Sequence, residues 1–162
     1  MPTWGWILIG VAAVVVVGIA VAWRPVSSVL REIRTERARE LFHLQRERLE
    51  AKFFDLAAKT GKPRGLRWVD ADWDDGVRFV RERQTGAMAA LVGITVRFEA
   101  IPGGGMEDNP NVSNLRDATA VFNYVRCQWI TEGRALFNMS PDGAIDRYHE
   151  QYEPVPAPDS NR

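Results

Sequence analysis

Three aspartates at alternate positions form the first group of residues in this chain that could do chemistry. Asp70, Asp72 and Asp74 would point to one side of a strand, where their carboxylate oxygens suit a hard cation. The spacing excludes a calcium-binding loop, because Gly76 falls one position late and Arg81 stands where a bidentate glutamate is needed. We therefore predict no metal site and interpret these aspartates as a solvated strand edge that leads into an Asp-Gly turn.

A glycine-rich run offers a second possibility, a cradle of backbone amides for a phosphate. No Gly-Lys-Ser or Gly-Lys-Thr follows the run, no helix clearly opens there, and its two acidic residues would repel an anion. We interpret the run as part of a long loop over residues 102–116, and we expect a partner to contact it there. Trp73, which stands among aspartates, is a second expected contact. The run consists of Gly103, Gly104, Gly105, Met106, Glu107 and Asp108.

The chain holds two histidines and one cysteine, His43, His149 and Cys127. A zinc site needs further ligands at characteristic spacings, and neither histidine has them. Cys127 falls at an expected turn without a nucleophile motif around it, and a single cysteine allows no intramolecular disulfide. We therefore predict no catalytic residue, no metal and no cofactor, and we favour a non-enzymatic role.

The run from Trp4 to Trp23 is apolar and uncharged, and it decides where we expect the protein to reside. A helix of this length, at about 1.5 Å per residue, would cover roughly 30 Å, the thickness of the hydrocarbon core of a bilayer. Tryptophans at both ends are typical of membrane interfaces, and two small residues four positions apart suit close helix packing. A signal peptide cleaved after Ala22 is the alternative, although no Lys or Arg precedes the run. The predicted span depends on Trp4, Trp6, Gly18, Ala22 and Trp23.

Charge is distributed unevenly along a chain that is neutral as a whole. Residues 24–67 carry 12 Lys or Arg against 6 Asp or Glu, whereas residues 68–162 carry 9 against 15. Positive charge beside a span stays in the cytoplasm, so we expect the following domain on the cytoplasmic side. Its acidic character argues against nucleic acid, and we expect the lipid bilayer and a protein partner or a second copy instead. The basic residues beside the span are Arg24, Arg31, Arg34, Arg37 and Arg39.

Hydrophobic periodicity predicts an α+β fold after the span. We expect Pro25 to kink or end the first helix. A long helix over residues 29–60 follows, with a polar start as a stalk and an apolar stripe from Leu41 to Leu56 that packs on a sheet. The sheet is expected to be an antiparallel meander of about five strands, half-exposed at residues 88–101 because apolar and polar side chains alternate there. The expected strands are residues 66–72, 77–82, 88–101, 118–125 and 129–137, and a short C-terminal helix covers residues 141–152.

These elements divide the chain into four expected parts. They are a transmembrane anchor over residues 1–24, a basic juxtamembrane stalk over 25–40, a soluble α+β domain over 41–152 and a disordered tail over 153–162. Cystatin-like and NTF2-like folds share the plan of one helix across an antiparallel sheet. This analogy keeps open a domain that binds or turns over a small ligand in a pocket between helix and sheet.

Three segments of the soluble part are similar to small uncharacterised membrane-anchored bacterial proteins. The segments are Pro63-Arg64-Gly65-Leu66-Arg67-Trp68, Arg83-Gln84-Thr85-Gly86 and Gly103-Gly104-Gly105-Met106-Glu107-Asp108. The resemblance implies a bacterial inner-membrane location and attaches no activity to any residue. We expect a single-pass protein whose domain acts as an adaptor or accessory subunit of a membrane assembly. An exported soluble protein, released by cleavage near Ala22, is the remaining alternative.

Overall fold

A computed structural model describes residues 4–60 and 63–157, and over residues 5–31 it describes the backbone alone. The chain divides into two compact units, Met1–Arg37 and Ala38–Arg162. A single helix, α1 (Trp4–Lys59), accounts for the described part of the first unit and continues into the second. Pro25 was expected to kink or end a helix, and the second outcome is wrong, since α1 runs through this residue. A proline inside a helix removes one backbone donor, and the residues around it continue the helix.

The predicted membrane span lies largely outside the described side chains. Within the part that the structure describes, no helix is long and apolar enough to cross a membrane. Trp4 is exposed, whereas the side chains of Trp6, Gly18, Ala22 and Trp23 fall outside the described residues. The span therefore stays a prediction from the sequence.

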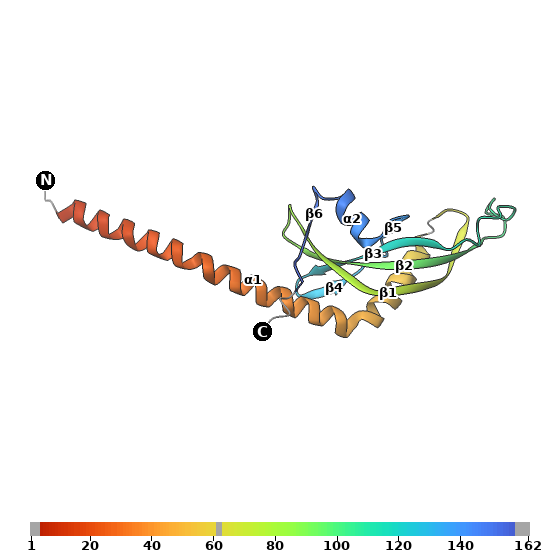
Figure 1. Ribbon diagram of the computed structural model, residues 1–162, viewed down its shortest axis with the longest axis horizontal. Helices are drawn as coiled ribbons and strands as arrows, with labels where there is room; N and C mark the ends of the chain where they lie inside the picture. The colour runs from red at the N-terminus through yellow and green to blue at the C-terminus, as the bar shows by residue number, and fades with distance from the viewer. Residues whose placement is uncertain (1–3, 61–62, 158–162) are drawn as a thin grey trace. The chain divides into compact units, whose positions relative to one another are not determined.

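The second unit is built on an antiparallel sheet of six strands. The strand order is β4-β3-β2-β1-β6, and β5 pairs with β3 off this path. Figure 1 shows this sheet between the C-terminal part of α1 on one face and the short helix α2 on the other. The prediction of an α+β fold with an antiparallel sheet is confirmed. The elements after α1 are β1 (Leu66–Glu82), β2 (Met88–Ala100), β3 (Arg116–Val125), β4 (Gln128–Ile130), β5 (Ala135–Phe137), α2 (Pro141–Arg147) and β6 (Tyr152–Pro154).

The main core lies between α1 and the sheet. Phe42, Leu49 and Phe53 are buried on one face of α1, at the spacing that turns side chains to the same side of a helix. The even-numbered residues of β2, from Met88 to Phe98, are buried against them. The two periodicities in the sequence therefore predicted correctly which face of the helix and which face of the strand meet.

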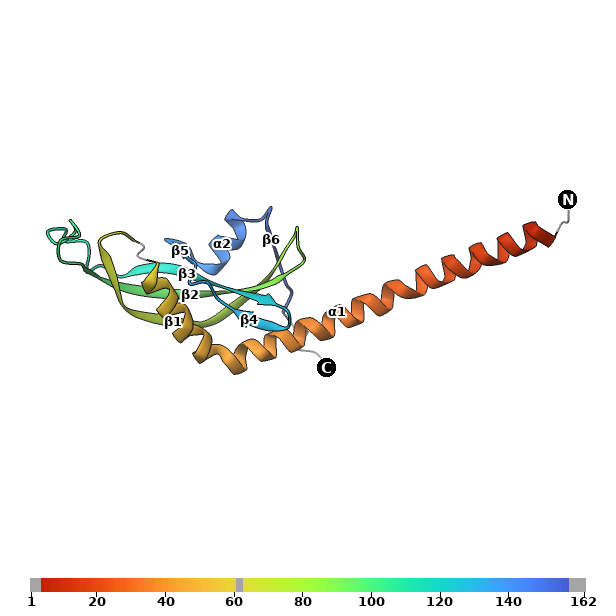
Figure 2. The ribbon, with the colours of Figure 1, turned by 180° about the vertical axis from the view of Figure 1, so that it is seen from behind.

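A second, smaller core lies on the opposite face of the sheet. Ala89 and Leu91 of β2 are buried there together with Val121 of β3 and Tyr152 of β6. Figure 2 shows α2, which covers this face, from behind. The first half of β2 is thus buried on both faces, and the expectation of a half-exposed strand holds only for its second half.

Several element boundaries differ from those that the sequence predicts. β1 is one strand across Asp74, Asp75 and Gly76, where a turn was expected, and its pairing with β2 shifts register between Trp73 and Val77. A register shift of this kind is a β-bulge, which bends a strand without ending it. The C-terminal side also differs, because β6 continues to Pro154 where disorder was expected from residue 153.

The expected strand over residues 129–137 is divided into β4 and β5. Gly133 lies between them with a φ of 71°, in the left-handed region that suits glycine. It presses on α1 so closely that an added Cβ would lie 2.5 Å from the backbone nitrogen of Ala57. α2 begins where the sequence predicts, with Ser140 as its N-cap and Pro141 in its first turn, but it ends at Arg147 rather than near residue 152.

Candidate functional site

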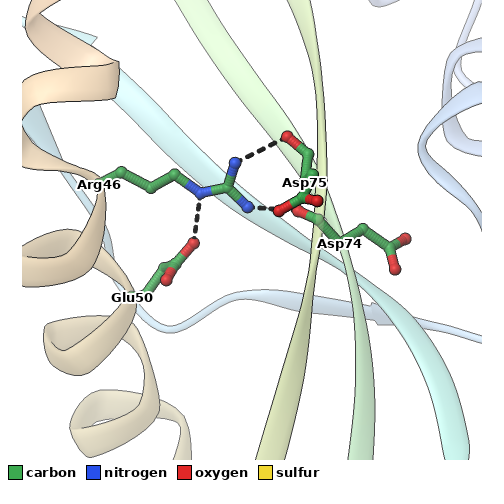
Figure 3. A network of polar contacts seen from close by, with 4 residues as sticks. All are labelled: Arg46, Glu50, Asp74 and Asp75. Carbon is green, nitrogen blue, oxygen red and sulfur yellow. Dashed lines mark hydrogen bonds and ion pairs between the residues drawn. The ribbon is translucent and has the colours of Figure 1, made fainter.

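A network of polar contacts ties α1 to the β-bulge of β1 (Figure 3). The Nε of Arg46 donates a hydrogen bond to Oε1 of Glu50 at 2.6 Å, one helical turn later. The two terminal nitrogens of Arg46 donate to the backbone carbonyl oxygens of Asp74 and Asp75, the latter at 2.7 Å. One guanidinium therefore holds the two carbonyl groups of the bulge in place, and Glu50 orients that guanidinium.

The pleat of β1 turns the side chains of Trp73 and Asp74 to opposite faces of the sheet. Trp73 is half-buried, and its ring packs edge-on against Phe53 at 5.4 Å between centroids. Trp73 is therefore less exposed than expected and packs against the core, and its contact with a partner stays a prediction. Asp74 points to the opposite face, away from Arg46 in Figure 3, and its carboxylate lies over Gly93. An added Cβ at Gly93 would overlap that carboxylate, so the exposed Asp74 side chain would have to move aside.

An open recess of about 590 Å³ lies beside Asp74 and Gly93 on this second face. Its walls come from β1, β2, β3 and the connection between β5 and α2. Its polar lining consists of carboxylate, hydroxyl and amide groups and one arginine. The polar residues of the recess are Asp74, Thr95, Arg116, Asp117, Asn138 and Ser140.

Hydrogen bonds hold most of these walls in position. Thr95 Oγ1 donates to Asp117 Oδ1 at 3.1 Å across neighbouring strands. The backbone nitrogen of Asn138, at a φ of 55°, donates to the carbonyl oxygen of Asp117 at 2.8 Å. Ser140 Oγ accepts from the backbone nitrogen of Gly143 at 3.1 Å as the N-cap of α2. The recess is therefore held open by the sheet and the start of α2.

The chemistry of the recess is that of hydrogen bonding. Two carboxylates and two hydroxyl groups would accept or donate to a hydroxylated or ammonium-bearing ligand. The histidines and the cysteine of the chain do not line it. His43 and His149 are both exposed, and Nδ1 of His149 lies 2.9 Å from the carbonyl oxygen of Asp146. Cys127 is exposed in the tight turn between β3 and β4, with a φ of 62°.

The alternating aspartates share one exposed face of β1, as the sequence predicts. They face different partners there, since Asp70 forms an ion pair with Arg97 at 3.2 Å whereas Asp72 lies opposite Thr95. Within residues 4–60 and 63–157, no group of three or more His, Cys, Asp or Glu side chains could hold a metal ion. The cross-strand pairing with Arg97 instead balances part of the negative charge on this face.

The glycine-rich loop does gather backbone amides around an anion, but the anion is its own glutamate. Glu107 accepts a hydrogen bond from the backbone nitrogen of Gly103. Hydrogen bonds from its own backbone amide, and then from those of Gly103, Met106 and Gly105, lower the pKa of Glu107. Gly104 also lies against Gly65, where an added Cβ would be 2.6 Å from the Gly104 carbonyl oxygen. The loop is therefore folded on the turn that precedes β1.

The basic residues assigned to the membrane surface separate into two groups. Arg34 and Arg37 are exposed, and the side chains of Arg24 and Arg31 lie outside the described residues. Arg39 is only 7% exposed, and its guanidinium lies 5.5 Å from the centre of the Phe79 ring. Arg39 therefore belongs to the interior of the second unit rather than to a solvated basic stalk. The sequence offered no signal for this role, because the contact joins residues far apart in the chain.

Comparison with known proteins adds no relative. The chain matches no protein-family model, no curated protein and no solved structure. The recess, the bulge and the glycine-rich loop are therefore interpreted from their geometry. The Arg46 and Glu50 pair beside the bulge carried a signal in the sequence, because a basic and an acidic residue stand at positions i and i+4 of a helix.

Proposed function

We propose that the chain is a non-enzymatic, single-pass membrane protein whose α+β domain binds another protein, as an adaptor or accessory subunit of a membrane assembly. The observation that supports a binding domain is the filling of the space between α1 and the sheet. The ring of Phe42 packs against Phe122 and Trp129 at 5.4 Å and 5.0 Å between centroids, and Phe53 packs against Phe122 at 5.7 Å. Aromatic rings thus occupy the place where a pocketed domain of this plan would hold a small ligand.

The membrane part of the proposal is supported by the sequence. The uncharged run from Trp4 to Trp23 has the length of a span, and arginines follow it rather than precede it. This asymmetry favours the bacterial inner membrane with the domain on the cytoplasmic side. The partners would be the lipid bilayer and a protein, either a different chain or a second copy.

Membrane extraction and protease protection test this proposal directly. We expect the intact chain to stay in the membrane fraction after an alkaline carbonate wash, and the domain to survive protease added outside spheroplasts. A periplasmic control protein must be digested in the same sample. Release by carbonate would contradict the anchor, and digestion of the domain would contradict its orientation. A mature N-terminus at Trp23 would support the exported alternative instead.

The partner is sought by purification of the tagged full chain from detergent-solubilised membranes, with mass spectrometry of what remains bound. A chain that carries several substitutions on one exposed face should lose that partner selectively. Purification of the chain as a monomer alone, at several detergent and salt concentrations, would count against an adaptor.

The recess beside Gly93 favours a second candidate function, the binding of a small polar ligand. Its volume of about 590 Å³ and its lining of carboxylate, hydroxyl and amide groups suit a polyol or an amine. We would expect such a ligand to raise the thermal midpoint of the full chain, and Asp74→Asn to abolish that rise. Screening of sugars, polyamines and amino acids by thermal shift tests it, and no shift with any of them would remove this candidate.

A further inference from the structure

The C-terminal segment of the chain lies along β1 as an added strand. Its three residues in β6 pair with Val80, Arg81 and Glu82 in antiparallel register. Two backbone hydrogen bonds extend the ladder, from Val155 N to the Phe79 carbonyl oxygen at 2.9 Å and from Arg83 N to the Gln151 carbonyl oxygen at 2.8 Å. This is how an extended peptide adds to the edge of a sheet.

Prolines occupy the outward-facing positions of this segment. The backbone N–H of Val155 faces β1, so the neighbouring positions in an extended strand face away from it. These positions are Pro154 and Pro156, which have no N–H to offer. The segment thus makes its hydrogen bonds to β1 and presents no donor to a further strand at these two positions.

A buried arginine holds the end of the segment through its backbone. Arg39 Nη2 donates to the carbonyl oxygen of Val155 at 3.3 Å and to that of Pro156. The Phe79 ring lies beside the Arg39 guanidinium, at the contact described above. Contacts of this kind recognise an extended main chain, and they require only that the peptide place two successive carbonyl groups there.

An aromatic side chain holds the other end. Tyr152 is 5% exposed and belongs to the second core, where its ring packs edge-on against Tyr148 at 6.4 Å. Between the two ends, Glu153 lies 3.5 Å from Arg83 in an exposed ion pair. The resident segment thus combines an aromatic anchor, an acidic residue and two alternate prolines.

We propose that the edge of β1 from Phe79 to Glu82, together with Arg39, is a peptide-docking slot for an extended segment with the pattern aromatic-acidic-Pro-x-Pro. Residues 152–156 occupy the slot in cis, and a segment of the same pattern in a partner protein replaces them. This inference rests on the proposed protein-binding role and names the chemistry of its partner.

Residues 152–156 and a partner segment would compete for the slot, and this competition can be measured as a change in the apparent affinity for an added peptide. A segment tethered to its own site acts at an effective concentration of about millimolar, so the slot is filled in the intact chain unless a partner segment is abundant or tight. Weakening the resident segment should therefore raise the apparent affinity for an added peptide. A segment that is simply part of the fold would show no such exchange.

The test uses the full chain in detergent micelles and a fluorescein-labelled peptide of residues 150–157. We expect the peptide to bind the chain with Val155→Pro at least about tenfold more tightly than the wild-type chain, because the substitution removes the resident N–H that bonds Phe79. The same peptide with Val155→Pro should not bind. Arg39→Lys, added to the Val155→Pro chain, should weaken binding by about tenfold, and Arg37→Lys, at an exposed position, should not change it.

A measurement on the unaltered chain guards against a variant that fails to fold. Excess unlabelled peptide should accelerate hydrogen exchange at the backbone amide of Val155 in the wild-type chain and leave that of Leu91, in the core, unchanged. The slot would be overturned if the peptide failed to bind the Val155→Pro chain and also failed to accelerate hydrogen exchange at Val155 in the wild-type chain. Equal binding of the two peptides would overturn it as well. These readouts require neither an anchor nor a natural partner, so their failure is distinct from failure of the extraction and purification tests.

Discussion

The indole Nε1 of Trp129 donates a hydrogen bond to the backbone carbonyl oxygen of Ala38 at 2.7 Å, in the buried interior. The two residues are 91 positions apart in the sequence, and the bond joins β4 to the first buried turn of α1 in the second unit. β4 has only three residues, so the hydrogen bond of the Trp129 side chain helps to hold this short strand on the core. The bond also fixes which turn of α1 packs against β4.

Replacement of Trp129 by phenylalanine should remove this bond while leaving an aromatic ring in the core. We expect the free energy of unfolding to fall by about 1–2 kcal/mol, because a buried hydrogen bond is lost and a smaller ring leaves space. Urea denaturation of the full chain in detergent measures it. Val125→Ala, at an exposed position of the neighbouring strand, should change stability by less than about 0.5 kcal/mol. Identical midpoints for Trp129→Phe and wild type would contradict the expectation.

Gly93→Ala should destabilise the chain by less than about 1 kcal/mol, because the new methyl group displaces only the exposed, flexible carboxylate of Asp74. Asp74→Ala should have little effect on its own, since Asp74 is exposed. In the double variant the loss should be relieved, with a coupling energy close to the loss measured for Gly93→Ala. A double-mutant cycle by urea denaturation tests the contact, and strictly additive effects would show that Gly93 is needed for another reason.

Arg46→Ala should loosen the β-bulge. The guanidinium bonds two carbonyl groups and Glu50, so we expect a loss of about 1–2 kcal/mol and faster hydrogen exchange at Val77. Arg48→Ala on the exposed side of α1 is the matched control, and it should leave both measurements unchanged. Equal effects of the two substitutions would mean that only charge on α1 matters.

Asp142 should contribute a small pH-dependent stability. Arg78 bonds both carboxylate oxygens of Asp142, from Nε at 2.7 Å and from Nη2 at 3.3 Å, and the hydrogen bond lowers the pKa of Asp142. A lowered pKa in the folded state stabilises it above the unfolded value, about 3.9, and this contribution is lost as the pH falls through the folded pKa. Both side chains are more than half exposed, so we expect less than about 1 kcal/mol.

Asp142→Asn tests this contribution against the wild-type chain by urea denaturation. The difference in free energy of unfolding should be present at about pH 7 and shrink as the pH falls below the unfolded pKa, about 3.9. A difference that grows as the pH falls would contradict the sign of the expectation.

The local elements of the fold were readable from residue patterns. Phe42, Leu49 and Phe53 follow the period of a helix, and alternate residues of β2 follow the period of a strand. Ser140 before Pro141 is a helix start in any context, since the cap bond is made to a residue three positions later. These predictions succeeded because the forces concerned act within one element.

Three features depended on contacts that no local pattern encodes. β1 continues across Asp74, Asp75 and Gly76 as a bulge whose carbonyl groups accept hydrogen bonds from Arg46, whereas the Asp-Asp-Gly sequence alone is typical of a turn. Gly133 separated β4 from β5 because α1 passes against it. The recess was not predicted for the same reason, since it is made where β1, β2, β3 and the start of α2 converge and belongs to none of them.

The sequence by itself determined which residues form the helix face, the strands and the candidate membrane span, because hydrophobic period and length are properties of consecutive residues. Only the tertiary structure decided that Arg39 is a buried clamp on Val155, a residue 116 positions away. The physical reason is that burial of the Arg39 guanidinium costs desolvation free energy. Folding offsets this cost by bringing carbonyl oxygens and an aromatic ring to the guanidinium.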